Sequence, residues 1–456
     1  MLTRELNSAS ALDAAHSVHP HTNLRAHLEQ GPLMIVKGDG IHVIDEDGNR
    51  YIEGAAGLWC ASLGFGNARL GEVAKTVMTD IGYYHNFRGA STPAAAELSA
   101  RLAAVAPDGM DRVLLQSSGT EANDTALKLV WYYWNAKGAP ERRKIISRSG
   151  AYHGTGTLTS CLTAKANFHA GFGLPFSGFL YTGMPYHYRM ARPGESEQEF
   201  STRLAEELEA MILAEGPETI AAFWAEPVMG SGGAITPPEG YFEKVQAVVR
   251  KHGILFVADE VICGFGRTGE MWGSQTYGIE PDLICCAKAL SAAMQPISAV
   301  IIREHVFQAM LEQSDRYGTF VHGYTYGGHP VASAVALEVL KIYEEMDLIG
   351  HVKSIAPGFL AGFEALRDHP LVGDARGVGL IGAIEMVADK TTKAMHDPSL
   401  KVMARIDAAT RRNGLITRLI GNRLALSPPQ IITSGEIEEM FARLKASLDT
   451  VAAELN

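Results

Sequence analysis

Cysteines are few and long apolar runs are absent in this sequence of 456 residues. The five cysteines are odd in number and no two have Cys-x-x-Cys spacing, so we expect reduced thiols and no metal site. No apolar stretch approaches the roughly 18 residues of a membrane span. Residues 1–21 also lack the apolar core of a signal peptide. These absences predict a cytoplasmic protein.

Basic segments are equally scarce. The formal net charge is -11, and the densest basic clusters, at 141–144 and 411–412, are too short to follow a phosphate backbone. We therefore expect neither a nucleic-acid nor a membrane partner. Hydrophobic residues make up 46% of the chain and charged residues 20%, which is typical of a globular protein with a large core.

The pattern along the chain predicts two lobes. Asp47-Gly48 between two alternating runs predicts a β-hairpin within residues 41–54. After about residue 330, amphipathic helices and short strands such as LIGAIEMV predict an α+β lobe that the hairpin completes, and Thr433 with Glu436 predicts a capping box on the last helix. Between the two, short apolar runs suit strands buried on both faces of a mainly parallel sheet. These runs are DRVLLQ (111–116), RKIIS (143–147), AAFWAE (221–226), ILFVADE (254–260) and DLICCA (282–287).

Three segments carry candidate chemistry. In residues 116–129 small residues join a strand to a helix, which would aim backbone N–H groups and the positive helix end at a phosphate. Ser118 with Glu121 equally fits an ordinary capping box. Asp259 ends an apolar strand, where ligands gather in parallel sheets, although an ion pair would also explain it. Lys288 follows another apolar run, and desolvation there would lower its pKa unless the side chain reaches solvent.

Pyridoxal phosphate (PLP) needs what these segments offer together: an anion site, a partner for the pyridinium nitrogen and a Schiff-base amine. The pattern Gly264-x-Gly266-x-x-Gly269 instead suggests a nicotinamide dinucleotide site. Residues 259–263 separate these glycines from the strand, whereas that fingerprint needs its first glycine in the tight turn itself. An NAD-dependent oxidoreductase is therefore a distant alternative.

Six motifs in order resemble the class III aminotransferases, and within them the ω-amine:pyruvate transaminases. The resemblance spans HPHTN (19–23) to LSPPQ (426–430), and its motifs are SSGTEAND, AYHG, AEPVMGSGG, ADEVICGFGRTG, AKALS and HGYTYGGHP. It implies an α/β protein of PLP fold type I, like aspartate aminotransferase. A large, mainly parallel-sheet domain that binds PLP would span 61–329, and a small α+β domain would combine 1–60 with 330–456.

The resemblance also implies the roles of the cofactor residues. Lys288 would hold PLP as a Schiff base and then move a proton between substrate and cofactor, while Asp259 would keep the ring nitrogen protonated. The other cofactor-binding positions are Ser118, Gly119, Thr120, Tyr152, His153, Glu226, Val261 and Thr325. Gly119 and Thr120 would bind the phosphate, and Tyr152 and Val261 would cover the two ring faces. Thr325 would serve the neighbouring subunit, which implies a homodimer, or a tetramer, with shared active sites.

The substrate pocket is implied in the same way. Trp59, Phe87 and Tyr152 match pocket positions of the ω-transaminases. Arg418 matches the mobile arginine that receives the carboxylate of pyruvate or alanine. A guanidinium suits this task because it can donate two parallel hydrogen bonds to a carboxylate.

Departures from the relatives sharpen the expected reaction. Ser231 stands where ornithine and γ-aminobutyrate transaminases carry a gating Glu, and Ile262 replaces a Gln, which favours pyruvate over 2-oxoglutarate as acceptor. Ala289 replaces the glycine of the usual AKGL and should modestly restrict the backbone. Arg88 would meet a second anionic group of the donor or, more simply, solvent.

The function implied is a ping-pong transfer from a primary amine or ω-amino acid to pyruvate, which gives alanine and an aldehyde or ketone. An aminomutase or a decarboxylase of the same fold is the alternative, because these enzymes share the lysine and the aspartate.

Overall fold

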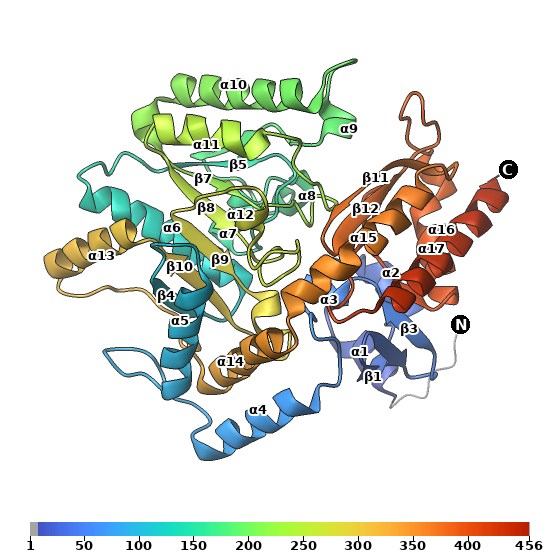
Figure 1. Ribbon diagram of the computed structural model, residues 1–456, viewed down its shortest axis with the longest axis horizontal. Coiled ribbons are helices and arrows are strands. Elements are labelled where there is room, and N and C mark those ends of the chain that lie inside the picture. Colours follow the sequence, from blue (N-terminus) through green and yellow to red (C-terminus); the bar gives the residue numbers. More distant parts are fainter. Residues whose placement is uncertain (1–7, 456) are drawn as a thin grey trace.

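A computed structural model describes residues 8–455; the parts of the expected small domain at 1–7 and 456 lie outside the described residues. Its largest sheet has seven strands in the order β4-β10-β9-β8-β7-β5-β6 (Figure 1). The strands are β4 (Arg112–Gln116), β10 (Ser298–Ile302), β9 (Leu283–Cys286), β8 (Leu255–Asp259), β7 (Ile220–Ala225), β5 (Lys144–Arg148) and β6 (Phe179–Thr182). Only β10 runs antiparallel to its neighbours, so the predicted mainly parallel sheet is confirmed.

Burial explains why the sequence indicated most of these strands. Every residue of β7, β8 and β9 is buried, so each strand is an unbroken apolar run apart from Asp259 at the end of β8. All five predicted strands form, whereas β6 and β10 were not predicted. Successive side chains face opposite sides of the sheet: Phe223 joins one core cluster and Trp224 the other.

Helices cover both faces of this sheet. One core cluster joins α5 (Pro93–Val105), α10 (Glu197–Glu215), α11 (Tyr241–Lys251) and α14 (Pro330–Glu345) to the sheet. The opposite cluster joins α6 (Gly119–Ala136), α7 (Thr157–Leu162) and α13 (Glu304–Tyr317) to it. The sheet therefore lies between two helical layers (Figure 1).

A second lobe holds two smaller sheets. One has the order β11-β12-β15-β14 and packs under three helices. These elements are β11 (Val372–Val378), β12 (Ile381–Met386), β15 (Arg423–Leu426), β14 (Arg418–Ile420), α15 (Leu348–Leu366), α16 (Val402–Arg412) and α17 (Ser434–Leu455). The predicted capping box begins α17, because Thr433 N–H donates to Glu436 Oε2 and Glu436 N–H to Thr433 Oγ1, at 2.8 and 3.3 Å.

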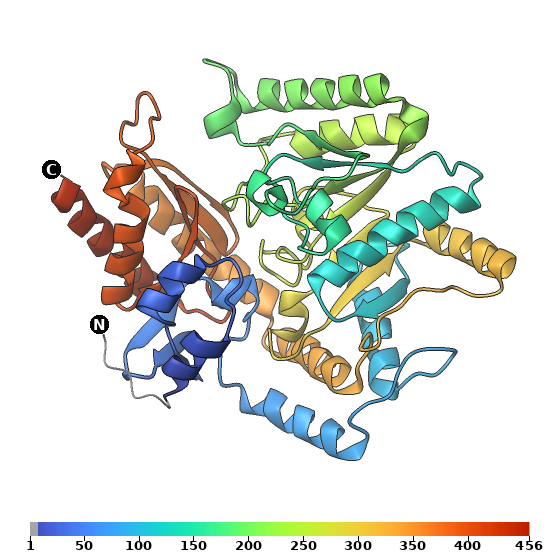
Figure 2. The ribbon, with the colours of Figure 1, turned by 180° about the vertical axis from the view of Figure 1, so that it is seen from behind.

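The other small sheet joins the two ends of the chain. The predicted hairpin forms from β2 (His42–Asp45) and β3 (Arg50–Glu53), with β1 (Ile35–Asp39) outside it. The short strand β13 (Leu415–Ile416) pairs parallel with β3, so segments far apart in the sequence lie side by side (Figure 2). The boundaries at 60/61 and 329/330 stay a prediction.

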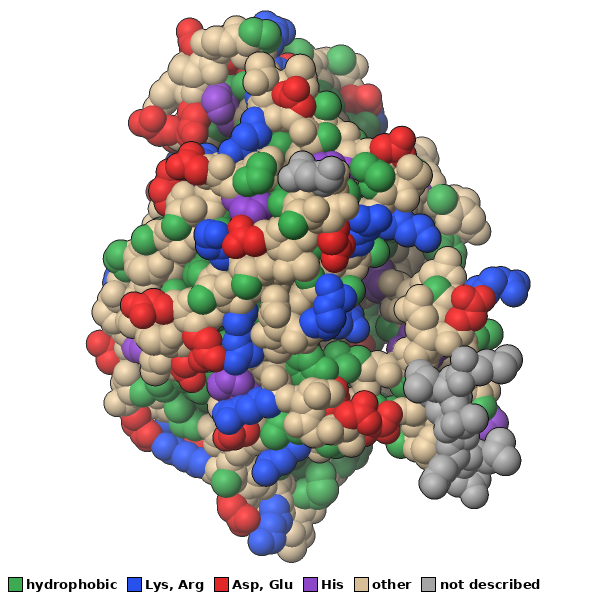
Figure 3. Space-filling view, turned by 90° about the vertical axis from the view of Figure 1, so that its right-hand side faces the viewer, with side chains coloured by type: hydrophobic (Ala, Val, Ile, Leu, Met, Phe, Trp, Pro, Cys, Tyr) green, Lys and Arg blue, Asp and Glu red, His purple; other side chains and the backbone are tan. Residues whose placement is uncertain are grey.

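The remaining elements connect the lobes and line their edges. They are α1 (Ala9–His16), α2 (Leu24–Gln30), α3 (Ala56–Trp59), α4 (Ala68–Asp80), α8 (Ala166–His169), α9 (His187–Met190), α12 (Gly273–Thr276), η1 (Pro217–Thr219), η2 (Lys288–Ser291) and η3 (Pro398–Leu400). No helix among residues 8–455 has the length and apolar character that a membrane crossing needs. On the face of the second lobe seen in Figure 3, acidic and basic side chains are interspersed.

Candidate active site

Lys288 lies where two central strands end. Strands β8 and β9 pair in parallel with Asp259 opposite Cys285. Asp259 and the residues after β9 therefore lie at the same end of the sheet, where these strands have their carboxyl ends. Lys288 begins η2 at that end of the sheet with a φ of 52°, a left-handed conformation that non-glycine residues seldom adopt. Burial lowers the pKa of its amine. Within residues 8–455 this amine has no hydrogen-bond or ion-pair partner, so it is free to act as a nucleophile.

Asp259 is buried and held by three donors. Asn123 donates its Nδ2–H to Oδ2 at 2.9 Å, and His153 Nδ1 contacts the same oxygen at 2.8 Å. The Val261 N–H donates to Oδ1 at 3.1 Å. Asn123 in turn accepts from Trp224 Nε1 at 2.8 Å, which ties α6 to β7 and β8. This network fixes the orientation of the carboxylate, as a partner for a cationic ring nitrogen requires.

The N-terminus of α6 follows the predicted geometry with one difference. Ser118 caps the helix by accepting from the Glu121 N–H at 3.2 Å. The reciprocal bond to Glu121 Oε2 comes from the Ser117 N–H, at 2.8 Å, and not from that of Ser118. Gly119 opens the helix so close to Val261 that a Cβ would lie 3.0 Å from Val261 Cγ1. Exposed helix N–H groups beside this small residue suit a phosphate.

Thr120 and Tyr152 come from adjacent parts of the same wall. Thr120 Oγ1 accepts from the Thr155 N–H at 3.4 Å. The Tyr152 N–H donates to Glu226 Oε1 at 3.2 Å, and the ring of Tyr152 packs edge-on against Phe168 at 5.5 Å. Burial, followed by the charges of Asp259 and Glu226, raises the pKa of Tyr152. These contacts hold the ring of Tyr152 close to the Asp259 carboxylate.

Glu226 sits at the end of β7 and braces a loop. Its Oε2 accepts from the Gly230 N–H at 3.0 Å, and burial raises the pKa of its carboxyl group. Gly230 lies against Ile262, which belongs with Trp59 to one buried apolar cluster. Trp59 is only 5% exposed, so it forms part of an apolar wall shared by both lobes.

Two cations lie beside Tyr152. The Arg418 guanidinium, on β14, has no hydrogen-bond or ion-pair partner in the part of the chain that the structure describes. Lys165 Nζ donates to Ser231 Oγ at 2.7 Å and to the Ser231 carbonyl, and it lies 6.0 Å from the centre of the Tyr152 ring. Burial lowers the pKa of Lys165 to about 8; Glu226 opposes this, whereas Arg423 and Arg418 add to it. Lys165 therefore lies near Arg418 as a cation without a carboxylate in hydrogen-bonding contact.

Lys165 and Asn123 were not among the residues predicted from the sequence. Asn123 lies inside the SSGTEAND motif four residues after Gly119, a spacing that places both on one helix face. That signal could have identified it. The sequence around Lys165 gives no comparable indication.

Three predicted residues lie on exposed segments instead. Phe87 is 41% exposed and packs against Gly323. The Tyr83 hydroxyl donates to the Thr325 carbonyl at 2.7 Å, and Thr325 is exposed. Arg88 is exposed as well. Phe87 and Thr325 thus belong to one surface that is built around residues 83–87 and 323–326.

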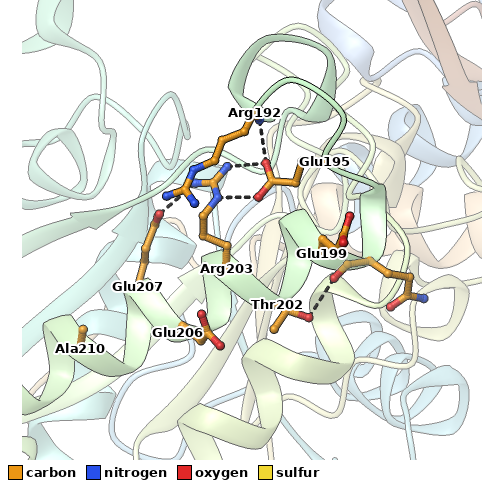
Figure 4. A pocket seen from close by; sticks show the side chains of 9 residues that line it. Arg192, Glu195, Glu199, Thr202, Arg203, Glu206, Glu207 and Ala210 are labelled. Carbon is orange, nitrogen blue, oxygen red and sulfur yellow. Dashed lines mark hydrogen bonds and ion pairs between the residues drawn. The ribbon is translucent and has the colours of Figure 1, made fainter.

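Other candidate features do not form a site. The glycines at 264, 266 and 269 precede only the four-residue helix α12, which gives no helix long enough to receive a dinucleotide pyrophosphate. A surface hollow along α10 is lined by charged residues that pair with one another (Figure 4). There, Arg203 binds Glu195 and Glu207 at 2.7 and 2.9 Å.

Known proteins resemble this chain over nearly its whole length. The family model "Aminotransferase class-III" matches residues 25–448. A mitochondrial γ-aminobutyrate transaminase of Solanum lycopersicum is 46% identical over 411 residues, which cover 90% of this chain and 80% of that protein. The ω-transaminase of Pseudomonas jessenii in complex with PMP is 47% identical with a TM-score of 0.96, and the match covers 98% of each chain. A transaminase with L-alanine is 47% identical with a TM-score of 0.92, over 93% of this chain and 100% of that one.

Proposed function

Because the chain belongs to the class III aminotransferases, we propose that it moves an amino group from a primary amine or ω-amino acid to pyruvate. Its fold is PLP fold type I, its cofactor is PLP and its activity is amino transfer. When bound, PLP supplies an electron-withdrawing ring that stabilises negative charge at the reacting carbon. The acceptor, the donor class and the residue roles below are the proposal.

The proposal is carried by the placement of Lys288 and Asp259 at the carboxyl ends of the neighbouring strands β9 and β8, within electrostatic range of each other. We assign Lys288 the covalent link to the cofactor and the transfer of the proton at the reacting carbon, because a buried amine of lowered pKa can be both nucleophile and base. Asp259, held by Asn123 and His153, would keep the ring nitrogen protonated. Tyr152 and Val261 would cover the two ring faces.

The phosphate would sit at the start of α6, with Ser118, Gly119 and Thr120. Thr325 would complete this cradle from the neighbouring subunit. Three exposed aromatic side chains adjoin Thr325, namely Tyr83, Phe87 and Tyr326, at 40, 41 and 63% exposure. Association of two chains would bury such a surface, so we propose a homodimer with shared active sites.

Pyruvate as acceptor is supported by two positions. Arg418 has a guanidinium available to bind a carboxylate in two-pronged fashion. Ser231 carries no charge that would neutralise that guanidinium, unlike the glutamate expected in enzymes that use 2-oxoglutarate. The transaminase with L-alanine is consistent with this choice, since alanine is the product formed from pyruvate.

Lys165 indicates which class of amine donor the site can bind. A desolvated ammonium group close to Arg418 can bind the carboxylate of an ω-amino acid in the first half-reaction, and Arg418 would bind that of the acceptor in the second. The likeness to a γ-aminobutyrate transaminase fits this donor class. Trp59 and Ile262 would contact the apolar part of the donor.

We also propose a cytoplasmic location, which the five unpaired cysteines support. The test of the function is to incubate the purified enzyme with one amine at a time and pyruvate. Alanine should form with γ-aminobutyrate and with amines that carry no carboxylate, and its formation should require Lys288. If 2-oxoglutarate were used in preference to pyruvate, the proposed acceptor would be wrong. Isomerised donor or carbon dioxide, with no alanine, would favour the mutase or decarboxylase.

A further inference from the structure

Three metal-ligating side chains meet in the N-terminal part of the chain, on α1, α2 and the segment between them. His19 Nε2 lies 2.9 Å from both carboxylate oxygens of Asp13, and His27 Nε2 lies 3.2 Å from Asp13 Oδ1. The imidazole rings of His19 and His27 are stacked, with centroids 4.0 Å apart. One potential ligand atom from each residue therefore belongs to a single compact cluster.

The spacing of these atoms suits a metal ion. Bonds of about 2.0–2.2 Å to a tetrahedral zinc ion place two ligand atoms about 3.3 Å apart. The ligand atoms of Asp13, His19 and His27 all lie within 4.8 Å of one another, and two of the separations are 2.9 and 3.2 Å. Small side-chain rotations would close the set around an ion.

Burial separates this cluster from an ordinary surface ion pair. The side chain of His27 is 6% exposed, that of Asp13 19% and that of His19 33%. A ring as buried as that of His27 needs a polar partner for Nε2, and here Nε2 faces the Asp13 carboxylate, beside which His19 brings a second ring nitrogen. The partial exposure of His19 leaves a path for the ion and room for a water as fourth ligand.

We propose that Asp13, His19 and His27 form a binding site for one divalent transition-metal ion, with zinc as the ion that two imidazoles and a carboxylate suit. The expectation of no metal site considered only cysteines, and this set contains none. The ion would be structural, because it joins α1 to α2 across residues 17–23.

The place of the site in the fold gives it a consequence. The segment between α1 and α2 also carries His21, whose ring lies 5.1 Å from that of Phe168. Phe168 packs against Tyr152 at 5.5 Å. An ion that holds this segment would therefore stiffen the aromatic layer beside the active site, and the enzyme would resist heat better with zinc than without it.

The experiment uses the tag-free, PLP-loaded enzyme after treatment with a chelator and desalting. Zinc is titrated by calorimetry, and cobalt(II) is titrated as a visible-absorption probe of the ligand set. We expect one ion per chain, with the affinity reduced about tenfold or more in His19→Ala, Asp13→Asn and His27→Leu. The matched control is His16→Ala, which removes an exposed histidine of α1 and should bind zinc as the parent does.

The cobalt spectrum separates loss of a ligand from loss of the fold, and His19→Ala removes a partly exposed ring that the core does not need. Absence of saturable uptake at one ion per chain would overturn the proposal. So would uptake that the three variants leave unchanged, or that His16→Ala abolishes equally.

Discussion

Replacing Lys165 with methionine should separate donors that carry a carboxylate from donors that do not. The methionine keeps the length and apolar contacts of the lysine stem but removes its charge. Among the residues that the structure describes, Lys165 Nζ donates hydrogen bonds to Ser231 alone, so its charge is available to a substrate. We expect activity toward γ-aminobutyrate to fall sharply, while activity toward butylamine, the same chain without its carboxylate, stays near that of the parent.

The size of the effect follows from one charged hydrogen bond in a poorly solvated place. Such a bond contributes about 1.5–3 kcal/mol. Since each 1.4 kcal/mol is about a factor of ten, kcat/KM for γ-aminobutyrate should fall about 10- to 150-fold. Because the pKa of Lys165 is lowered to about 8, the ammonium form is lost as pH rises through that value. The advantage of γ-aminobutyrate over butylamine should therefore decline above about pH 8 in the parent and be independent of pH in Lys165→Met.

The assay is alanine formation from pyruvate with each donor, from pH 7 to pH 9. Lys75→Met, which removes an exposed lysine of α4, is the control and should leave both donors unaffected. Equal losses for γ-aminobutyrate and butylamine would contradict a role of Lys165 in binding the donor carboxylate, because they would indicate damage to the fold or to the cofactor site.

Three further predictions concern the cofactor site and stability. Asn123→Ala removes a donor to Asp259, so kcat should fall about tenfold or more with the cofactor still bound; an unchanged kcat would mean that His153 and Val261 suffice. Thr325→Ala should weaken PLP binding in the homodimer, and mixed dimers with Lys288→Ala chains should regain one site of parental affinity; no recovery on mixing would argue against shared sites. Burial raises the pKa of Glu53 from 4.5 to about 7, so the folded chain keeps a proton that the unfolded chain loses, and the associated stability declines between these two pH values. Glu53→Gln should thus raise the free energy of unfolding by up to about 3 kcal/mol at pH 8 and much less at pH 5, as measured by urea denaturation; an equal gain at both pH values would contradict this.

Local patterns predicted much of the fold, for identifiable reasons. Strands β7, β8 and β9 are buried on both faces, so their sequences are apolar without interruption. The hairpin and the Thr433 cap depend only on near neighbours. Strand β6 could not be recognised in the same way, because its four residues are mostly half-buried and give no clear period. The pairing of β13 with β3 joins residues more than 350 positions apart, which no local pattern reveals.

The site was predictable where residues sit at element ends and not where distant segments meet. Asp259 ends one buried strand and Lys288 closely follows another, so the sequence pattern alone identified both as candidate site residues. The network that joins Asp259 to Asn123 and His153 depends on β8, α6 and the loop at residues 151–154 coming together in space. Ala289 does not adopt a positive φ. The alanine that replaces glycine there is therefore not forced into a left-handed conformation. The roles of Thr325 and Phe87 depend on a second chain, which a single chain does not define.

The most direct test of the proposed active site is to identify the residue to which PLP is covalently attached. Reducing the PLP-loaded enzyme with borohydride, digesting it and sequencing the labelled peptide by mass spectrometry identifies the modified residue. We expect a single pyridoxyl group on Lys288, and none when a donor has first converted the enzyme to its aminated form. A label on another lysine, such as Lys165, or no label on a fully active enzyme would contradict this expectation.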